Sequence, residues 1–262
     1  MSINKMNITY ELNPPKFLHD RYCFDYSKLN NEIQVLENRV LLLNDIVDKI
    51  HLTDSVLGIP RLSSINIAKI IEGKLKQILI SCSIRTRDRN TISLYQMIAD
   101  SIIAKIDSLL LIWGDKPKMG TEIAGVKPTD LLKDLNQMNF NRYIKFNLSI
   151  PSKITGINKI LEKKIDAGPN AFVTQSIESI SDFGNIVDIV RPYKIKVIAC
   201  IMLPSEKNKK SADMIGLSWN EYEKDPVDFI LQIGKMAEEI ILSSPNDFSY
   251  GIEILNGLKK YR

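Results

Sequence analysis

The sequence is poor in the residues that build metal centres and disulfides. Its 262 residues include three cysteines and two histidines. Cys23, Cys82 and Cys200 lie far apart and form no CxxC pair. Two of them fall in strand-like runs, so we expect buried free thiols, which fits a reducing cytoplasm. Two histidines are too few for a histidine-rich metal site, and we expect no bound metal.

Several motifs of common enzyme and membrane protein classes are also absent. No GxGxxG follows a predicted strand, so nothing supports a Rossmann nucleotide site. No GxSxG elbow occurs, which leaves Ser-His-Asp hydrolase chemistry without support. No apolar run approaches the roughly 20 residues of a membrane span, and no signal-peptide pattern opens the sequence. We therefore expect a cytoplasmic protein without membrane association.

The charge balance argues against a nucleic-acid partner. Thirty-five Lys and Arg residues face 31 Asp and Glu residues, a formal net charge of +4. This is mildly basic and well short of a nucleic-acid signature. The lysine-rich stretch at Lys207, Lys209 and Lys210 has no interleaved aromatic residues of the kind that stack on bases.

What the chain does contain is a regular alternation. Short runs rich in Ile, Leu and Val each stop at a polar residue, and a helical pattern follows. Such alternation predicts βαβ units and a parallel sheet. A (β/α)8 barrel typically needs about 250 residues. We therefore predict one (β/α)8 (TIM) barrel that spans residues 1–262 as a single catalytic domain.

The boundaries of the predicted elements follow from the same pattern. We predict strands at about 7–13, 77–83, 108–112, 144–150, 171–175 and 197–203, a second strand ending at Thr53-Asp54, and an eighth within Tyr250 to Leu255. A helix starting at Asp225-Pro226 is predicted to bury Ile230, Ile233, Ala237 and Ile240. The segment from Pro204 to Lys224 is predicted to be irregular.

Polar residues at the predicted strand ends are the candidate site. In a (β/α)8 barrel the carboxyl ends of the strands build the active site, so Glu11, Thr53, Ser83, Asp115 and Gln175 should ring one pocket. A carboxyl such as Glu11 in an apolar wall has a raised pKa, as a general acid needs. The alternative is a carboxylate paired with an Arg or Lys at the barrel mouth.

Three further features have both a functional and a structural interpretation. Gly114 would allow a ligand close to the backbone, so Asp115 could orient a polar cofactor ring, or simply make a turn. The Gln175 amide suits a heterocycle with a lactam edge, or lines the barrel as a satisfied polar group. The arginines of residues 85–89 could receive phosphate or a polyglutamate tail, or form a self-paired loop. His51, inside the second strand, is predicted to be a core or wall histidine.

At these positions the sequence resembles the methylenetetrahydrofolate reductase family, in its short, barrel-only form. The matching segments, in order along the chain, are YELNPP (10–15), LTDSVLGIPRLSS (52–64), RTRDRN (85–90), WGDKP (113–117), KKIDAGPNAFVTQ (163–175) and IMLP (201–204). The resemblance implies that Glu11 is the catalytic acid, that Asp115 influences a flavin, and that Gln175 contacts the pterin.

The activity implied by the resemblance is reduction of 5,10-methylene-tetrahydrofolate, or of a methanopterin-like analogue, to the 5-methyl form. The implied cofactor is FAD, reduced by NADH or NADPH. Thr53, Ser83, Trp113, Gly114 and Asp115 would contact the flavin. Family members often self-associate, so a homo-oligomer is an expectation by analogy, as is an electron-donor or methyltransferase partner.

The sequence departs from the family where a flavin would be held. Ser83 replaces the usual histidine after the third strand, Trp113 precedes the Gly-Asp pair, and Ser149-Ile150-Pro151 replaces an HPE-like stretch. These departures keep two alternatives open. One is direct hydride transfer from NAD(P)H to the pterin without flavin. The other is a non-redox pterin-binding subunit of a methyl-transfer system.

Overall fold

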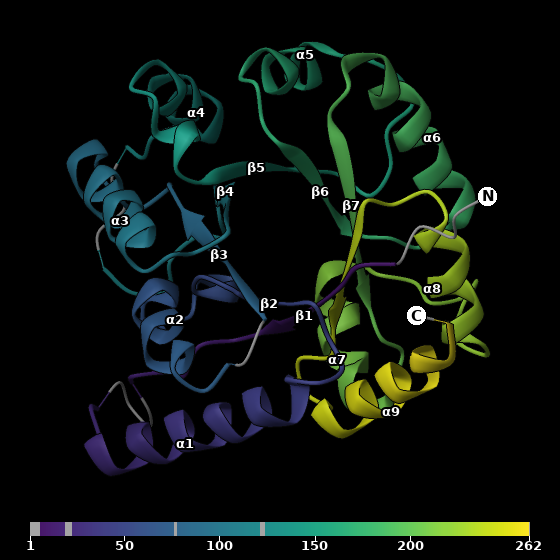
Figure 1. Cartoon of the computed structure of the whole chain (residues 1–262), viewed down its shortest axis with the longest axis horizontal. Helices are drawn as coiled ribbons and strands as arrows, with labels where there is room; N and C mark the ends of the chain where they lie inside the picture. Colours follow the sequence, from purple (N-terminus) through teal and green to yellow (C-terminus); the bar gives the residue numbers. More distant parts are fainter. Residues whose placement is uncertain (1–5, 19–22, 76–77, 121–123, 262) are drawn as a thin grey trace.

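The computed structural model describes residues 6–18, 23–75, 78–120 and 124–261. Eight parallel strands form a closed barrel in the order of the sequence, and helices surround them (Figure 1). The strands are β1 (Ile8–Leu12), β2 (Lys49–Leu52), β3 (Leu79–Arg85), β4 (Ser108–Ile112), β5 (Lys145–Ile150), β6 (Ala171–Ser176), β7 (Lys196–Met202) and β8 (Glu239–Ser243). The predicted (β/α)8 barrel is thereby confirmed.

Helices connect the strands on the outside of the barrel (Figure 1). They are α1 (Tyr26–Leu43), α2 (Ser64–Glu72), α3 (Thr91–Ile103), α4 (Pro128–Gln137), α5 (Lys159–Asp166), α6 (Ile180–Val190), α7 (Glu206–Ile215), α8 (Pro226–Gly234) and α9 (Phe248–Leu258). Short 3-10 turns lie at Val56–Gly58, Phe140–Arg142, Arg191–Tyr193 and Lys259–Tyr261. Within the described residues, no helix combines the length and apolarity needed to cross a membrane.

Most of the predicted strand positions agree with the structure, but the eighth is wrong. The closing strand is β8, whereas Tyr250 to Leu255 lies inside α9. The buried residues of α9 are Gly251, Ile254, Leu255 and Leu258, which recur every three or four positions as on one helical face. The sequence IEIL is therefore an apolar helix face that imitates a strand. The start of the third predicted strand at Gln77 lies outside the described residues.

The helix before β8 also ends earlier than predicted. It starts at Pro226, with the Asp225 carboxylate accepting a hydrogen bond from the Asp228 backbone, but it stops at Gly234. Ile240 belongs to β8 and pairs in register with Ile8 of β1, which closes the barrel. Because the helical spacing continues from Ile230 to Ile240, the predicted helix wrongly includes the start of the strand that follows it.

The segment from Pro204 to Lys224, predicted to be irregular, contains helix α7. The Ser205 hydroxyl accepts a hydrogen bond from the Asn208 backbone N–H and so caps the helix. Gly216, with φ +70°, ends it. The buried side of α7 is narrow, formed by Asn208 and Ala212, so its sequence lacks the apolar stripe that usually reveals a helix.

Two packed regions support the barrel. The larger core lies between the strands and the helices, and includes Tyr10, Phe146 and Phe172. A smaller apolar cluster fills the barrel interior and consists of Ala171, Val173, Ile198 and Ile241, with Leu110 and Cys200 packed against it. This interior cluster forms a floor beneath the carboxyl ends of the strands, where the candidate site lies.

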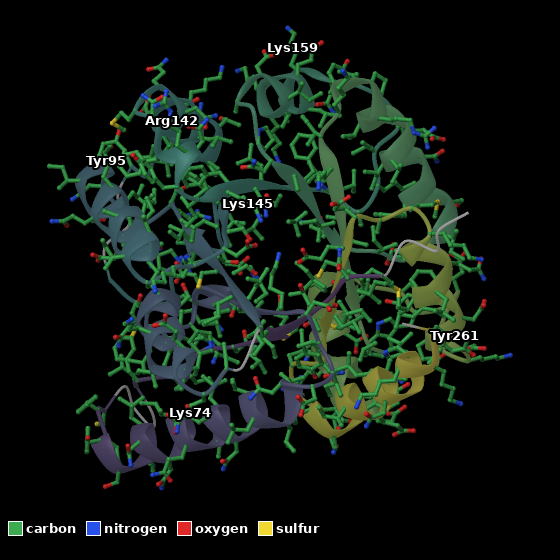
Figure 2. The ribbon with its side chains drawn as sticks, viewed as in Figure 1. Lys74, Tyr95, Arg142, Lys145, Lys159 and Tyr261 are labelled. Atoms are coloured by element: carbon green, nitrogen blue, oxygen red, sulfur yellow. The ribbon has the colours of Figure 1, made fainter. Side chains whose placement is uncertain are left out.

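The opposite end of the barrel interior is charged. Lys49 Nζ lies 2.7 Å from Glu239 Oε2 and 3.1 Å from Asp107 Oδ2, and Lys145 pairs with Asp107 at 2.7 Å. Figure 2 shows Lys145 inside the ring of helices, whereas Lys159 on α5 points outward. The carboxylates and amines of this network neutralise one another, so we interpret the network as structural. The candidate site lies at the opposite end of the barrel, at the carboxyl ends of the strands.

Candidate active site

Glu11 lies near the carboxyl end of β1, and its side chain is partly buried. Its Oε1 accepts a hydrogen bond from the Ser243 hydroxyl at 2.7 Å. Burial raises the pKa of Glu11, and the Ser243 hydrogen bond opposes this rise only in part. Within the described part of the chain Glu11 has no Lys or Arg partner, so these residues give no support to the alternative of an ion-paired carboxylate. The group is suited to hold a proton and to deliver it.

Two cavities meet at Glu11. The inner cavity, of about 190 Å³, is lined by Glu11, His51, Thr53, Ser83, Gly114 and Asp115, among other residues. The lateral cavity, of about 370 Å³, is lined by Glu11, Gln175, Ser176, Glu178, Gly216 and Ser243, among others. Glu11 and Cys200 belong to both linings. A proton on Glu11 can therefore reach a molecule that lies in either cavity.

The structure brings most of the predicted site residues to this mouth. Thr53, Ser83, Gly114 and Asp115 share the inner cavity with Glu11, whereas Gln175 is exposed in the lateral cavity. The Thr53 hydroxyl donates to Asn13 Oδ1 at 2.6 Å, which ties the end of β2 to the segment after β1.

Asp115 is fixed by the loop that follows β2. Its Oδ2 accepts a hydrogen bond from the Leu57 backbone N–H at 2.8 Å. Gly58 packs directly on the chain after Asp115: a Cβ there would lie 2.0 Å from the Lys116 carbonyl oxygen. The second carboxylate oxygen of Asp115 has no partner within the described residues. The close packing of the two loops sets the position of Asp115 at the cavity rim.

The arginines after β3 are engaged within the protein. The buried Arg85 guanidinium donates to the carbonyls of Ser55 and Asp115, each at 2.8 Å, and to Asp88 at 3.0 Å. Arg89 donates to the buried Asp54 carboxylate at 2.5 Å. The self-paired interpretation of this cluster is confirmed for Arg85, which pairs with Asp88, and for Arg89, which pairs with Asp54. Both pairs are largely buried and not solvated. These two arginines stabilise the mouth and are not available to a phosphate.

Trp113 does not join the other predicted cofactor residues. Leu110, Ile112 and Gly114 face the inner cavity, so the alternate residues Leu111 and Trp113 face outward. Trp113 therefore lies in another cavity than Asp115, and its contact with a flavin stays a prediction.

Trp113 instead lines an outer cavity of about 570 Å³ beside α4 and α5. Four lysines line the same cavity, namely Lys127, Lys133, Lys163 and Lys164. Lys164 donates to the Ser149 carbonyl, and burial lowers the pKa of its amine. Within the described residues Lys164 has no carboxylate partner. A half-buried amine with a carbonyl as its partner favours an anionic ligand.

His51 is the wall histidine that the sequence predicts, but it also reaches the site. Its ring is buried and is hydrogen-bonded to the Ser81 and Ser83 hydroxyls at 2.9 and 2.8 Å. Burial lowers its pKa to about 4, with a smaller contribution from the charge of Lys49, so the imidazole is neutral at pH 7. Among the described residues, no group of three or more His, Cys, Asp or Glu side chains is arranged to hold a metal ion.

Sequence reasoning missed Ser243, the direct partner of Glu11. The run EIILSS has the same signal as the other strands, an apolar segment that ends in polar residues. This strand was not predicted because Ile240 also fits the helical spacing of the residues before it. The thiols at Cys82 and Cys200 are free, as predicted, and burial raises the pKa of both.

Comparison with known proteins supports the fold and leaves the activity open. No protein-family model and no curated protein sequence matches the chain. Many solved structures share the fold, including the following three. An aldolase named QR15 is 12% identical, with a TM-score of 0.60 and coverage of 99% of this chain and 97% of the aldolase.

The other two structures are similarly distant in sequence. An oxaloacetate acetylhydrolase is 9% identical, with a TM-score of 0.60, over 97% of this chain and 81% of that one. A chain of the tryptophan synthase complex from Pyrococcus furiosus is 13% identical, with a TM-score of 0.52, over 98% and 95%. Similarity at such low identity shows the barrel fold alone.

Proposed function

We propose that the chain is an oxidoreductase that reduces 5,10-methylene-tetrahydrofolate, or a methanopterin-like analogue, to the 5-methyl form. The observation that carries this proposal is Glu11: a partly buried carboxyl group without a cationic partner among the described residues, hydrogen-bonded to Ser243, at the junction of two cavities. Opening of the five-membered ring of the methylene form needs a proton at the leaving nitrogen. A carboxyl group with a raised pKa can supply that proton near neutral pH.

The lateral cavity is the proposed place of the pterin. Gln175 is exposed there, with both an amide donor and a carbonyl acceptor free to meet the lactam edge of the ring. Glu11 lies at the inner side of the same cavity, so the proton would be delivered from the barrel axis. Cys200 and Met202 add an apolar surface against which a ring can pack.

The residues of the inner and outer cavities fit a flavin dinucleotide in two parts. The Thr53 and Ser83 hydroxyls, Gly114 and Asp115 offer polar contacts to a ring at the inner cavity. The lysines beside Trp113, above all the half-buried Lys164, fit a diphosphate, and the Trp113 ring fits an aromatic base. A bound flavin would supply the relay of a hydride from NADH or NADPH to the substrate.

One observation favours a second candidate, direct hydride transfer from NAD(P)H without a flavin. Trp113 faces outward from β4, and the inner cavity that remains is only about 190 Å³. In this case the lysines of the outer cavity would bind the phosphates of the nicotinamide dinucleotide. Glu11 and Gln175 keep the same roles in both candidates.

The absorption spectrum of the purified protein separates the candidates. An oxidised-flavin band that bleaches on anaerobic addition of NADH or NADPH, and recovers on addition of methylene-tetrahydrofolate, supports the flavin-dependent reductase. Stoichiometric NAD(P)H oxidation by protein free of flavin supports direct transfer. Pterin binding without oxidation of NAD(P)H or of the methyl-pterin refutes both and favours a non-redox pterin-binding protein.

A further inference from the structure

A histidine and two serines form a string of hydrogen bonds inside the barrel that ends at the inner cavity. His51 Nδ1 bonds the Ser81 hydroxyl at 2.9 Å, and Nε2 bonds the Ser83 hydroxyl at 2.8 Å. His51 and Ser83 lie on the neighbouring strands β2 and β3, and both line the inner cavity with Glu11. No other described side chain bonds the Ser83 hydroxyl, so its remaining hydrogen-bonding capacity faces the cavity.

Because the His51 ring is neutral, the hydrogen bonds of Ser81, His51 and Ser83 can run in two directions. A neutral imidazole has one N–H donor and one acceptor nitrogen. With the proton on Nδ1, Nε2 accepts from Ser83, and the serine oxygen can only accept a hydrogen bond from a ligand. With the proton on Nε2, the ring donates to Ser83, whose O–H is then free to donate to a ligand. The hydroxyl at the cavity thus reverses its direction when the histidine changes tautomer.

The inner end of the string leads into a second polar space. A cavity of about 10 Å³ lies below the ring and is lined by His51, Ser81, Ser108, Asn147 and Glu239, among others. This volume is about that of one water molecule, and the lining groups can donate to it or accept from it. A water in this cavity would give the Ser81 hydroxyl a partner in either direction, and both tautomers of His51 would then keep their hydrogen bonds.

We propose that His51 is a positioning residue, which sets whether the Ser83 hydroxyl donates to or accepts from the heterocycle bound in the inner cavity. A ring nitrogen that is bare in one state of a reaction and carries hydrogen in another needs such a reversible partner. The inference rests on the proposed function, because it requires a nitrogen heterocycle in this cavity. In this inference His51 acts on the bound heterocycle through the Ser83 hydroxyl.

Nitrogen NMR of the full chain tests the inference directly, because the sequence has only two histidines. Protein labelled with 15N-histidine gives separate Nδ1 and Nε2 resonances, and the variant His51→Gln identifies those of His51. In the ligand-free chain, Ser83→Ala should shift Nε2 more than Nδ1, and Ser81→Ala should do the opposite. Ser101→Ala removes a buried serine on α3 that bonds Met97, and it should shift neither.

The decisive measurement adds FAD, and separately 5-methyl-tetrahydrofolate, to the same protein. Binding of at least one probe should change the proportion of the two His51 tautomers. Ser83→Ala should abolish this response, and Ser83→Thr, which keeps the hydroxyl, should restore it. Binding that leaves both His51 resonances unchanged overturns the inference alone. Failure of both probes to bind overturns the inference together with the flavin-dependent, folate-reducing form of the proposed function.

Discussion

Ser243, the last residue of β8, donates a hydrogen bond of 2.7 Å to Glu11 on β1, and this contact spans the seam where the barrel closes. The first and last strands thus hold the proposed acid between them. The only hydrogen-bonding side chain that Glu11 contacts within the described residues is neutral, and burial therefore dominates its pKa. The same contact that completes the fold also sets the chemistry of the site.

The variant Glu11→Gln tests the acid. Glutamine keeps the shape and the partner Ser243 but carries no transferable proton, so methylene-pterin reduction should fall by roughly 10²–10⁴-fold, as for a lost general acid. Binding of FAD and its reduction by NAD(P)H should persist. Because a buried carboxyl with a raised pKa costs stability when it ionises as the pH rises, the neutral amide should not lower stability at pH 8.

Rapid-mixing kinetics separate the two half-reactions for this variant. Near-normal turnover of methylene-tetrahydrofolate in Glu11→Gln would show that another group supplies the proton. A matched control is Glu178→Gln, which changes another carboxylate of the lateral cavity and should retain most of the activity.

The variant Ser243→Ala tests the hydrogen bond. The Ser243 hydroxyl lowers the pKa of Glu11, so its loss should raise that pKa further. The alkaline limb of the profile of kcat/KM against pH, which reports loss of the proton from Glu11, should move to higher pH. Ser243→Thr retains the hydroxyl and should keep the wild-type limb. A limb that stays in place in Ser243→Ala would dissociate this titration from Glu11.

The sequence predicted the barrel and most of its mouth because both depend on local patterns. Seven strands fall in runs rich in apolar residues, and polar residues lie at or near their carboxyl ends: Thr53 directly follows β2, and Ser83 lies near the end of β3. The failure at β8 has a local cause as well. Ile230, Ile233 and Ile240 keep a helical spacing across the break at Gly234, so periodicity alone could not separate the helix from the strand.

The direction and pairing of side chains were harder to predict than the elements. Continuing the alternation of β4 past Ile112 would have placed Trp113 on the outer side of the barrel, opposite to Gly114. The bonds of His51 to Ser81 and Ser83 depend on strand register, since Ser81 pairs with His51 in the ladder between β2 and β3. Register between separate strands is a tertiary property that no single run of residues encodes.

The low pKa of His51 predicts a pH-dependent stability. The folded protein holds the ring neutral down to about pH 4, whereas the unfolded chain binds the proton near pH 6.5. Between these values the unfolded state binds more protons, so the free energy of unfolding should fall as the pH is lowered from 7. The loss attributable to His51 should reach about 2 kcal/mol at pH 5.

Urea unfolding at pH 7 and pH 5 measures this loss, with His51→Gln as the comparison. The variant lacks the titrating ring, so it should lose about 2 kcal/mol less than the wild type between the two pH values. Equal losses in both proteins would place the ring in a solvated environment and contradict the hydrogen-bonded geometry.

Because Arg85 donates to the Asp115 carbonyl, we expect its loss both to lower the stability of the protein and to loosen the loop that holds Asp115. Arg85→Met would leave the Ser55 and Asp115 carbonyls and Asp88 without their donor, and should lower the free energy of unfolding by roughly 3 kcal/mol. Limited proteolysis should then cut within the loops after β2 and β4. Arg191→Met, which removes an exposed pair with Asp188, should change stability by less than about 1 kcal/mol. Equal changes in the free energy of unfolding for the two variants would show that Arg85 does not stabilise the loops at the mouth of the barrel.

Lys164 distinguishes a dinucleotide from a smaller flavin. Its half-buried amine lines the outer cavity with a carbonyl as its partner, so an anionic diphosphate would gain a charge-assisted hydrogen bond there. Lys164→Met should weaken FAD binding by about 10- to 100-fold, the range for a lost bond to a charged group, and should leave riboflavin affinity nearly unchanged. Lys159→Met on the outward side of α5 should affect neither ligand (Figure 2). Fluorescence titration with both ligands measures the difference, and an equal loss for FAD and riboflavin would place the diphosphate elsewhere, because only FAD carries that group.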